Sequence, residues 1–84
     1  MQDKILRETL SKIIDKERKS KNIDYLVFCD ENSIATSTYD NLINAKTNIT
    51  FYNLTKIIKG LGLNYESFGK ILDKNLPESF WNED

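Results

Sequence analysis

The sequence predicts a small all-α domain, a compact bundle of about five short helices. Apolar residues recur every three or four positions in several separate segments, as they do on the buried face of an amphipathic helix. Residues that cap helix N-termini precede three of these segments: Asp24, Thr50 and Asn64. Eighty-four residues are enough for one domain and too few for two. We therefore expect a single domain over 1–84, with its core at about 18–72 and an acidic C-terminal tail at 76–84.

The first predicted helix runs from about Asp3 to Lys19. Its apolar residues follow a spacing near i, i+4 and i+8, and charged residues occupy the opposite face. These apolar residues are Ile5, Leu6, Leu10, Ile13 and Ile14. The polar run 16–21 ends the helix, where its lysines complement the negative end of the helix dipole.

The second segment, Asp24 to Glu31, has two interpretations. Asp24 is a candidate N-cap, which favours a short helix. The apolar run 25–29 fits a short buried strand as well, because neither its length nor its composition separates the two structures. The residues alone therefore leave both interpretations open, and a break follows at 32–33.

Three further helices are expected after this break. The third covers about Thr36 to Asn44, and a turn follows at 46–48. The fourth covers Phe51 to Gly60 behind the cap Thr50, with an apolar stripe of Leu54, Ile57, Ile58 and Leu61. A fifth helix begins after Asn64, carries Tyr65, Phe68, Ile71 and Leu72, and ends before Pro77.

The composition argues against several classes of function. The chain has no histidine, the commonest general base and metal ligand, and no glycine-rich phosphate loop. Cys29 is the only cysteine, so no internal disulfide can form, and we interpret it as a buried small residue rather than a redox sensor. We therefore expect no enzyme, no metal and no cofactor. Without a membrane-spanning run or a signal-peptide pattern, we expect a cytoplasmic protein.

Charge is balanced overall but unevenly distributed. Twelve basic and thirteen acidic residues give a net charge of −1, so the chain as a whole does not attract nucleic acid. Residues 1–21 hold seven basic and four acidic residues, and 46–63 hold three lysines and no acid. Residues 22–45 hold four acids and no base, and 64–84 hold two lysines and five acids. Any electropositive face must therefore come from 1–21 and 46–63.

The segment from Tyr25 to Asn44 meets the physical requirements of two helices joined by a tight turn. A small residue is needed where the helices cross, and Cys29 supplies it. Ser33, four positions later, lies at the turn, where the backbone takes an unusual φ. The second helix needs two apolar residues that face inward, and Tyr39 and Leu42 supply them.

On these residues the chain resembles the phage-repressor Cro/C1-type (XRE-like) helix-turn-helix family. The resemblance spans about Arg18 to Leu72 and needs no gap from Ile23 to Leu63. Its most specific part is the ending, Leu54 to Leu63. The resemblance implies the lambda-repressor-like DNA-binding domain fold. It also implies a transcription regulator that acts as a homodimer and places two recognition helices in successive major grooves of double-stranded DNA.

The resemblance also implies which residues meet DNA. The groove-facing positions of the recognition helix are Ala35, Thr36, Ser37, Asp40, Asn41 and Asn44. In the loop that approaches the DNA backbone, the candidates are Lys46, Thr47 and Asn48. The chain departs from the family pattern with Ser33 in place of a glycine, Ala35 in place of a capping serine, and Tyr25 in place of a glutamine.

Other charged and aromatic residues have more than one interpretation. Arg18, Lys19 and Lys21 are further candidates for phosphate contacts, whereas Lys56 and Lys59 are expected to point to solvent. The tail residues Phe80 and Trp81 either cover the core or form a dimer contact.

Because the recognition helix has no lysine or arginine, a protein-interaction module on the same fold is the alternative function, such as an antitoxin, an antirepressor or an accessory subunit. Its contact surface would be the apolar face around Tyr25, Tyr39 and Phe80–Trp81.

Overall fold

The structure, a computed structural model, describes residues 2–82 and contains six α-helices and no strand within them. The helices are α1 (Gln2–Ser20), α2 (Tyr25–Glu31), α3 (Thr36–Ile43), α4 (Phe51–Gly60), α5 (Tyr65–Asn75) and α6 (Glu78–Asn82). The prediction of a small all-α bundle is confirmed.

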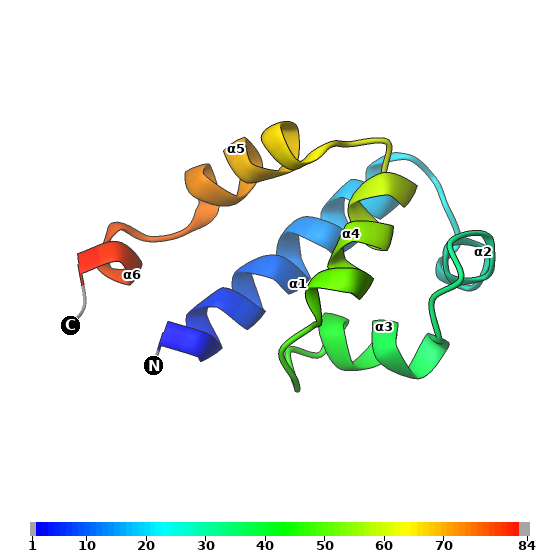
Figure 1. Cartoon of the computed structure of the whole chain (residues 1–84), viewed down its shortest axis with the longest axis horizontal. Coiled ribbons are helices and arrows are strands. Elements are labelled where there is room, and N and C mark those ends of the chain that lie inside the picture. The colour runs from blue at the N-terminus through cyan, green and yellow to red at the C-terminus, as the bar shows by residue number, and fades with distance from the viewer. Residues whose placement is uncertain (1, 83–84) are drawn as a thin grey trace.

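The long helix α1 is the centre of the arrangement (Figure 1). Both α3 and α5 contact α1, and α2 contacts α3. In Figure 1, α5 lies above α1, whereas α3 lies below it. The start of α1 lies near α6, where the Gln2 side chain donates to the carbonyl oxygen of Phe80 at 2.6 Å.

Three helix starts match the residues that were expected to cap them. The Asp24 carboxylate accepts from the amides of Leu26 and Val27 at 3.0 and 3.4 Å, which settles the second segment as a helix. Thr50 accepts from the amide of Asn53, and Asn64 forms a capping box with Ser67. These bonds satisfy amides that a helix start otherwise leaves without acceptors.

The structure differs from the prediction by one residue at each end of α1, and also at the end of the third helix and in the C-terminal tail. The third helix ends at Ile43, and Asn44 is its C-cap. The acidic tail was not expected to be helical, but Glu78–Asn82 forms α6. Proline 77 explains this difference: its fixed φ suits the first turn of a helix, and its carbonyl accepts from the amide of Phe80 at 2.9 Å. The last two residues of the predicted tail, Glu83 and Asp84, lie outside the described residues.

The core is apolar and draws on α1 to α5. Its most completely buried side chains are Ile14, Phe28, Cys29, Ile57, Leu61 and Tyr39, each exposing no more than 2 % of its surface. The cluster also contains Leu10, Ile13, Ile34, Leu42, Ile58 and Phe68. Among the described residues no polar or charged side chain is fully buried, so the core is held mainly by apolar contact.

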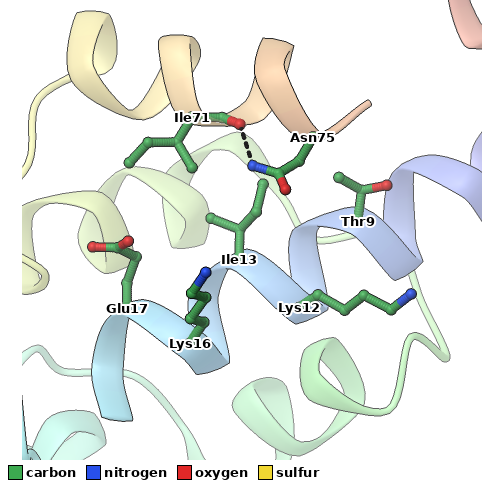
Figure 2. Close-up of a pocket in the computed structure, with 7 residues that line it drawn as sticks. All are labelled: Thr9, Lys12, Ile13, Lys16, Glu17, Ile71 and Asn75. Carbon is green, nitrogen blue, oxygen red and sulfur yellow. Dashed lines mark hydrogen bonds between the residues drawn. The ribbon is translucent and has the colours of Figure 1, made fainter. Parts of the chain in front are cut away.

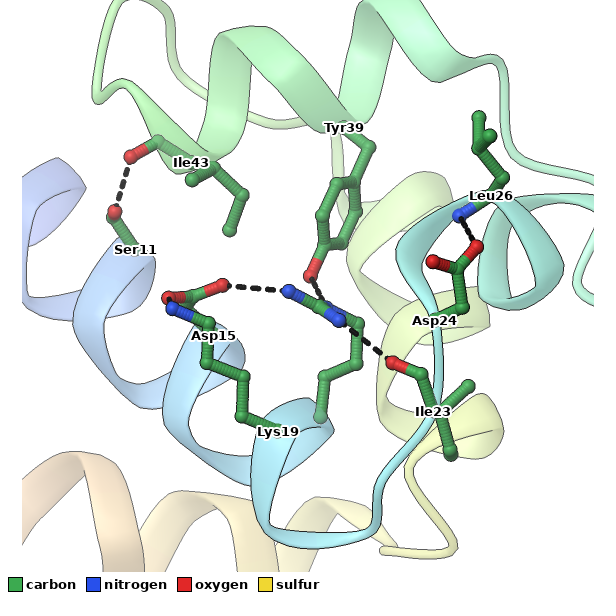
Figure 3. Close-up of polar contacts among 9 residues, drawn as sticks. Ser11, Asp15, Lys19, Ile23, Asp24, Leu26, Tyr39 and Ile43 are labelled. Carbon is green, nitrogen blue, oxygen red and sulfur yellow. Dashed lines mark hydrogen bonds and ion pairs between the residues drawn. The ribbon is translucent and has the colours of Figure 1, made fainter.

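One partly buried arginine, Arg18, connects α1 to the segments that follow it through Tyr39 and Ile23, both labelled in Figure 3. The Arg18 guanidinium donates to the hydroxyl of Tyr39 at 2.8 Å and to the carbonyl oxygen of Ile23 at 2.6 Å. Its third donor binds the carboxylate of Asp15 at 3.0 Å, which also pairs with Lys19 at 2.8 Å. Arg18 therefore fixes α3 and the chain leading into α2 against α1, and its prediction as a phosphate contact is wrong.

Burial raises the pKa of the Tyr39 hydroxyl, although Arg18 opposes the shift. The hydroxyl is therefore neutral at physiological pH and accepts from Arg18. The pKa of Asp15 is lowered, mainly by its hydrogen bond with Lys19, so this carboxylate is ionised. Each member of the group has a partner, and removing one leaves another without its hydrogen bond at a cost of about 1–3 kcal/mol.

We expect Arg18→Met to lower the free energy of unfolding by about 2–3 kcal/mol, because Tyr39, Ile23 and Asp15 all lose a donor. The double variant Arg18→Met/Tyr39→Phe should cost less than the sum of the two single variants, since the orphaned hydroxyl is removed as well. Urea denaturation of the four proteins measures this coupling. The exposed Lys19→Met is the matched control and should cost under about 1 kcal/mol. Strictly additive energies would contradict the interpretation.

Candidate nucleic-acid interface

The turn between α2 and α3 is made by Ser33 in the left-handed conformation, with φ of 56°. The amide of the following residue, Ile34, donates back to the carbonyl oxygen of Cys29 at 2.9 Å. This bond closes the end of α2 and reverses the chain within a few residues. The predicted turn position is therefore confirmed, and serine adopts a conformation that usually favours glycine.

A residue with positive φ follows the end of each of four consecutive helices, α1 to α4. Asn22, Ser33, Ala45 and Gly62 all have positive φ, and each is followed by an amide that donates back into the preceding helix. Only the last of the four is glycine. The connections can therefore be short, but three of them carry backbone strain at a residue with a Cβ atom.

The helix crossing contains the residues that the sequence placed there. Cys29, Tyr39 and Leu42 expose 1, 2 and 3 % of their surfaces. The Tyr39 ring lies 5.8 Å from that of Phe28 and 6.1 Å from that of Tyr25, between centroids. Burial raises the pKa of the Cys29 thiol, which keeps it protonated and unreactive. These inward residues anchor α3 while leaving its other side free.

The exposed side of α3 is polar. Thr36, Ser37, Asp40 and Asn44 are exposed, and Asn41 is half-buried. The side-chain amide of Asn44 donates to the carbonyl oxygen of Asp40 at 2.9 Å, and this bond closes the C-terminal end of α3. At the other end Ala35 supplies no capping side chain, which leaves the first amides of α3 available to an outside acceptor.

The loop after α3 adjoins the helix. Asn41 lies with Thr47 and Asn48 on the wall of one hollow of about 180 Å³, and Lys46, Thr47 and Asn48 are all exposed. The structure therefore brings one predicted recognition-helix residue together with two predicted loop residues. The positive φ of Ala45 produces this placement by turning the chain sharply at the end of α3.

Arg7 is a cation of this region that the sequence did not single out. From the first turns of α1 it donates to the carbonyl oxygen of Ala45 at 3.2 Å and lies 3.5 Å from the side-chain oxygen of Asn48. It also pairs with Asp3 at 3.0 Å. Because these contacts join residues far apart in sequence, only the general excess of basic residues in 1–21 pointed towards it.

The other basic residues divide into bound and free side chains. Lys56 was expected to point to solvent, but its ammonium donates to the carbonyl oxygen of Ser33 at 2.7 Å and lies 4.5 Å from the ring centroid of Tyr52. Lys56 therefore holds the turn to α4. Lys21 and Lys59 are exposed, and Lys19 is exposed while paired with Asp15.

Helix α4 also braces the turn through Gly60. A Cβ atom at this position would lie 2.6 Å from the side-chain amide of Asn32, so any larger residue here would displace that amide. The Asn32 side chain in turn donates to the carbonyl oxygen of Phe28 at 2.8 Å. Together with Lys56, this contact fixes the turn and hence the start of α3.

A second polar hollow lies between α1 and α5, on the opposite side of α1 from α3 (Figure 2). It measures about 290 Å³, and its walls carry Lys12, Lys16 and Glu17 from α1 and Asn75 from α5. The Asn75 side chain is already bound to the carbonyl oxygen of Ile71 at 2.7 Å. This hollow is separate from the surface around α3.

Within residues 2–82, no helix has both the length and the apolar character needed to cross a bilayer. Nor does this part of the chain gather three His, Cys, Asp or Glu side chains in a way that would hold a metal ion. Comparison of the chain with models of protein families, with curated proteins and with solved structures gives no match.

We expect Ala45→Gly to stabilise the protein by about 1 kcal/mol, because glycine adopts a positive φ without the steric cost that alanine bears. For a domain of this size the melting temperature should rise by roughly 5 °C in a calorimetric scan. Asn22→Gly is the matched comparison and should give a smaller gain, since asparagine tolerates the left-handed region. A melting temperature that falls, or that rises more for Asn22→Gly, would contradict this.

Proposed function

We propose that this protein binds double-stranded DNA and regulates transcription, with α3 as its recognition helix. The observation that carries the proposal is the two-sided character of α3. Tyr39 and Leu42 fix its inner side in the core, while its outer side presents Thr36, Ser37 and Asn44 to solvent. A helix held in this way can enter the major groove as a rigid body.

The exposed side chains suit base contacts more than phosphate contacts. Asn41 and Asn44 carry both a donor and an acceptor, which matches the major-groove edge of adenine. Thr36 and Ser37 can contact either bases or phosphates. Asp40 is suited only to a donor such as the amino group of cytosine, and it repels phosphates. Preference for sequence would therefore come from few, directional contacts.

Phosphate contacts would come from beside α3. The uncapped amides at its start suit a phosphate oxygen, because they lie at the positive end of the helix dipole. Lys46 and Arg7 flank the loop at its other end. With so few cations, binding should be weaker and less dependent on salt than that of a strongly basic domain.

The resemblance to the Cro/C1-type family supports the same proposal. The spacing of Cys29, Ser33, Tyr39 and Leu42 fits that family, and these residues form the crossing and the turn. Membership of the family and action as a homodimer are part of the proposal.

A fluorescence anisotropy titration against random-sequence duplexes, at about 20–200 mM salt, tests DNA binding. We expect binding at low salt that weakens as salt rises, because phosphate contacts release counterions. Lys46→Gln should weaken binding and lower the slope of log K against log salt by about 1. Lys74→Gln, which changes another exposed lysine, on α5, is the matched control and should leave both unchanged. Absence of binding at the lowest salt would refute the proposal.

Replacement of the acid on the recognition helix gives a second test. Asp40→Asn should tighten binding by about two- to five-fold, because it removes a charge that repels nearby phosphates at a cost of roughly 1 kcal/mol. Asp73→Asn makes the same change on α5 and should have little effect. Equal affinities for Asp40→Asn and the unchanged protein would mean that α3 does not approach the DNA backbone.

A protein-interaction module is the second candidate function, and an apolar strip on α2 favours it. Leu26 and Val27 expose 53 and 47 % of their surfaces beside the half-exposed Tyr25. Tyr39, which was expected to belong to such a contact surface, is instead buried in the core. The titration separates the two candidates, since this function predicts weak or no binding to DNA and no effect of Lys46→Gln.

A further inference from the structure

Three exposed aromatic side chains lie together on α4 and at the start of α5. Phe51, Tyr52 and Tyr65 expose 71, 72 and 55 % of their surfaces. We call the surface formed by these rings, Lys56 and Lys59 the α4 face. Large aromatic rings so exposed are uncommon on a monomer and mark a surface that meets a partner.

The rings of the α4 face are held in place. Phe51 stacks on Tyr65, with ring centroids 5.7 Å apart and planes 8° apart, and the Tyr65 hydroxyl bonds to that of Thr55 at 2.8 Å. Lys56 fixes Tyr52 from the other side, since its ammonium lies 4.5 Å from the ring centroid and is itself bound to Ser33. Because these side chains are already ordered, binding would cost them little conformational entropy.

A hollow of about 320 Å³ lies directly beside the exposed Tyr52 ring. Its walls are Glu31, Asn32, Ser33, Tyr52, Lys56 and Lys59. Glu31 and Lys59 are both exposed, and neither forms an ion pair within residues 2–82. One surface therefore carries a projecting ring, a hollow of suitable size, an acid and a base.

We propose that the α4 face binds a second copy of this chain about a two-fold axis. Such an interface brings the same patch of both copies together, so the patch must complement itself. The Tyr52 ring of each copy enters the hollow of the other, and Glu31 of each copy pairs with Lys59 of its partner copy. The presence of both signs of charge beside the rings favours a second copy over a partner of a single charge.

The exposed area of the α4 face limits how stable such a dimer can be. A buried aromatic side chain removes about 150–250 Å² from water, so the exposed parts of the three rings offer about 400 Å². A stable interface buries about 800 Å² per partner, and the hollow and its charged walls supply further area. Because the rings alone supply about half of that area, the dimer is expected to dissociate on dilution rather than to be permanent.

This inference deepens the proposed function, on which its biological meaning rests, but the dimer is measured without DNA. None of the exposed residues of α3 belongs to the α4 face, so the proposed dimer contacts do not use the recognition side chains. Failure to dimerise and failure to bind DNA are therefore separate results.

Sedimentation velocity across about 1 µM to 1 mM protein tests the interface. We expect a monomer–dimer equilibrium whose dissociation constant rises at least tenfold in Tyr52→Ser. Trp81→Ser is the matched control, because it removes a ring that is 62 % exposed on α6, and it should leave the constant unchanged. A monomer throughout the range, or a dimer lost with Trp81→Ser but kept with Tyr52→Ser, overturns the proposal.

A charge exchange tests the pairing itself. Glu31→Lys and Lys59→Glu should each weaken the dimer, since each places like charges opposite one another. The double variant restores opposite charges across the axis and should recover most of the lost affinity. A double variant no tighter than the weaker single variant overturns the pairing. Circular dichroism confirms that all variants stay helical, and both positions are exposed and tolerant of change.

Discussion

The hydrogen bonds of Arg18 are the interaction on which the candidate interface depends. Helix α3 has only eight residues and no side chain that caps its N-terminus, so it has little stability of its own. Its position comes from contact with α1, through Leu42 and Tyr39 in the core and through the bond from Arg18 to the Tyr39 hydroxyl. The same guanidinium holds the chain before α2 through Ile23. One side chain thus sets both helices of the unit against α1.

The turn between these helices is fixed from the other side by α4. Gly60 leaves room for the side-chain amide of Asn32, and Lys56 binds the carbonyl oxygen of Ser33. The left-handed conformation of Ser33 is costly for a residue with a Cβ atom, and these contacts hold it in place. A rigid turn matters for recognition, because a helix that is fixed before binding loses less entropy when it enters a groove.

The α4 face lies next to the contacts that hold this turn. Lys56 contributes to both, since it holds Ser33 and also orders the ring of Tyr52. A partner bound at the hollow would touch Asn32 and Ser33, the residues that set the start of α3. The proposed dimer surface therefore adjoins the turn that precedes the recognition helix. Contact between two copies would restrict the motion of this turn.

The sequence by itself determined the local features of this protein. Caps such as Asp24 and Asn64 mark helix starts because they bond to amides two or three residues away, and the inward set of Cys29, Tyr39 and Leu42 follows from helical periodicity. Only the tertiary structure decided which charges are bound. The contacts of Arg18, Lys56 and Arg7 join residues 21, 23 and 38 positions apart, and periodicity carries no information at such separations. Periodicity likewise predicts an apolar stripe but not what covers it, so the exposed rings of α4 became visible only in the folded chain.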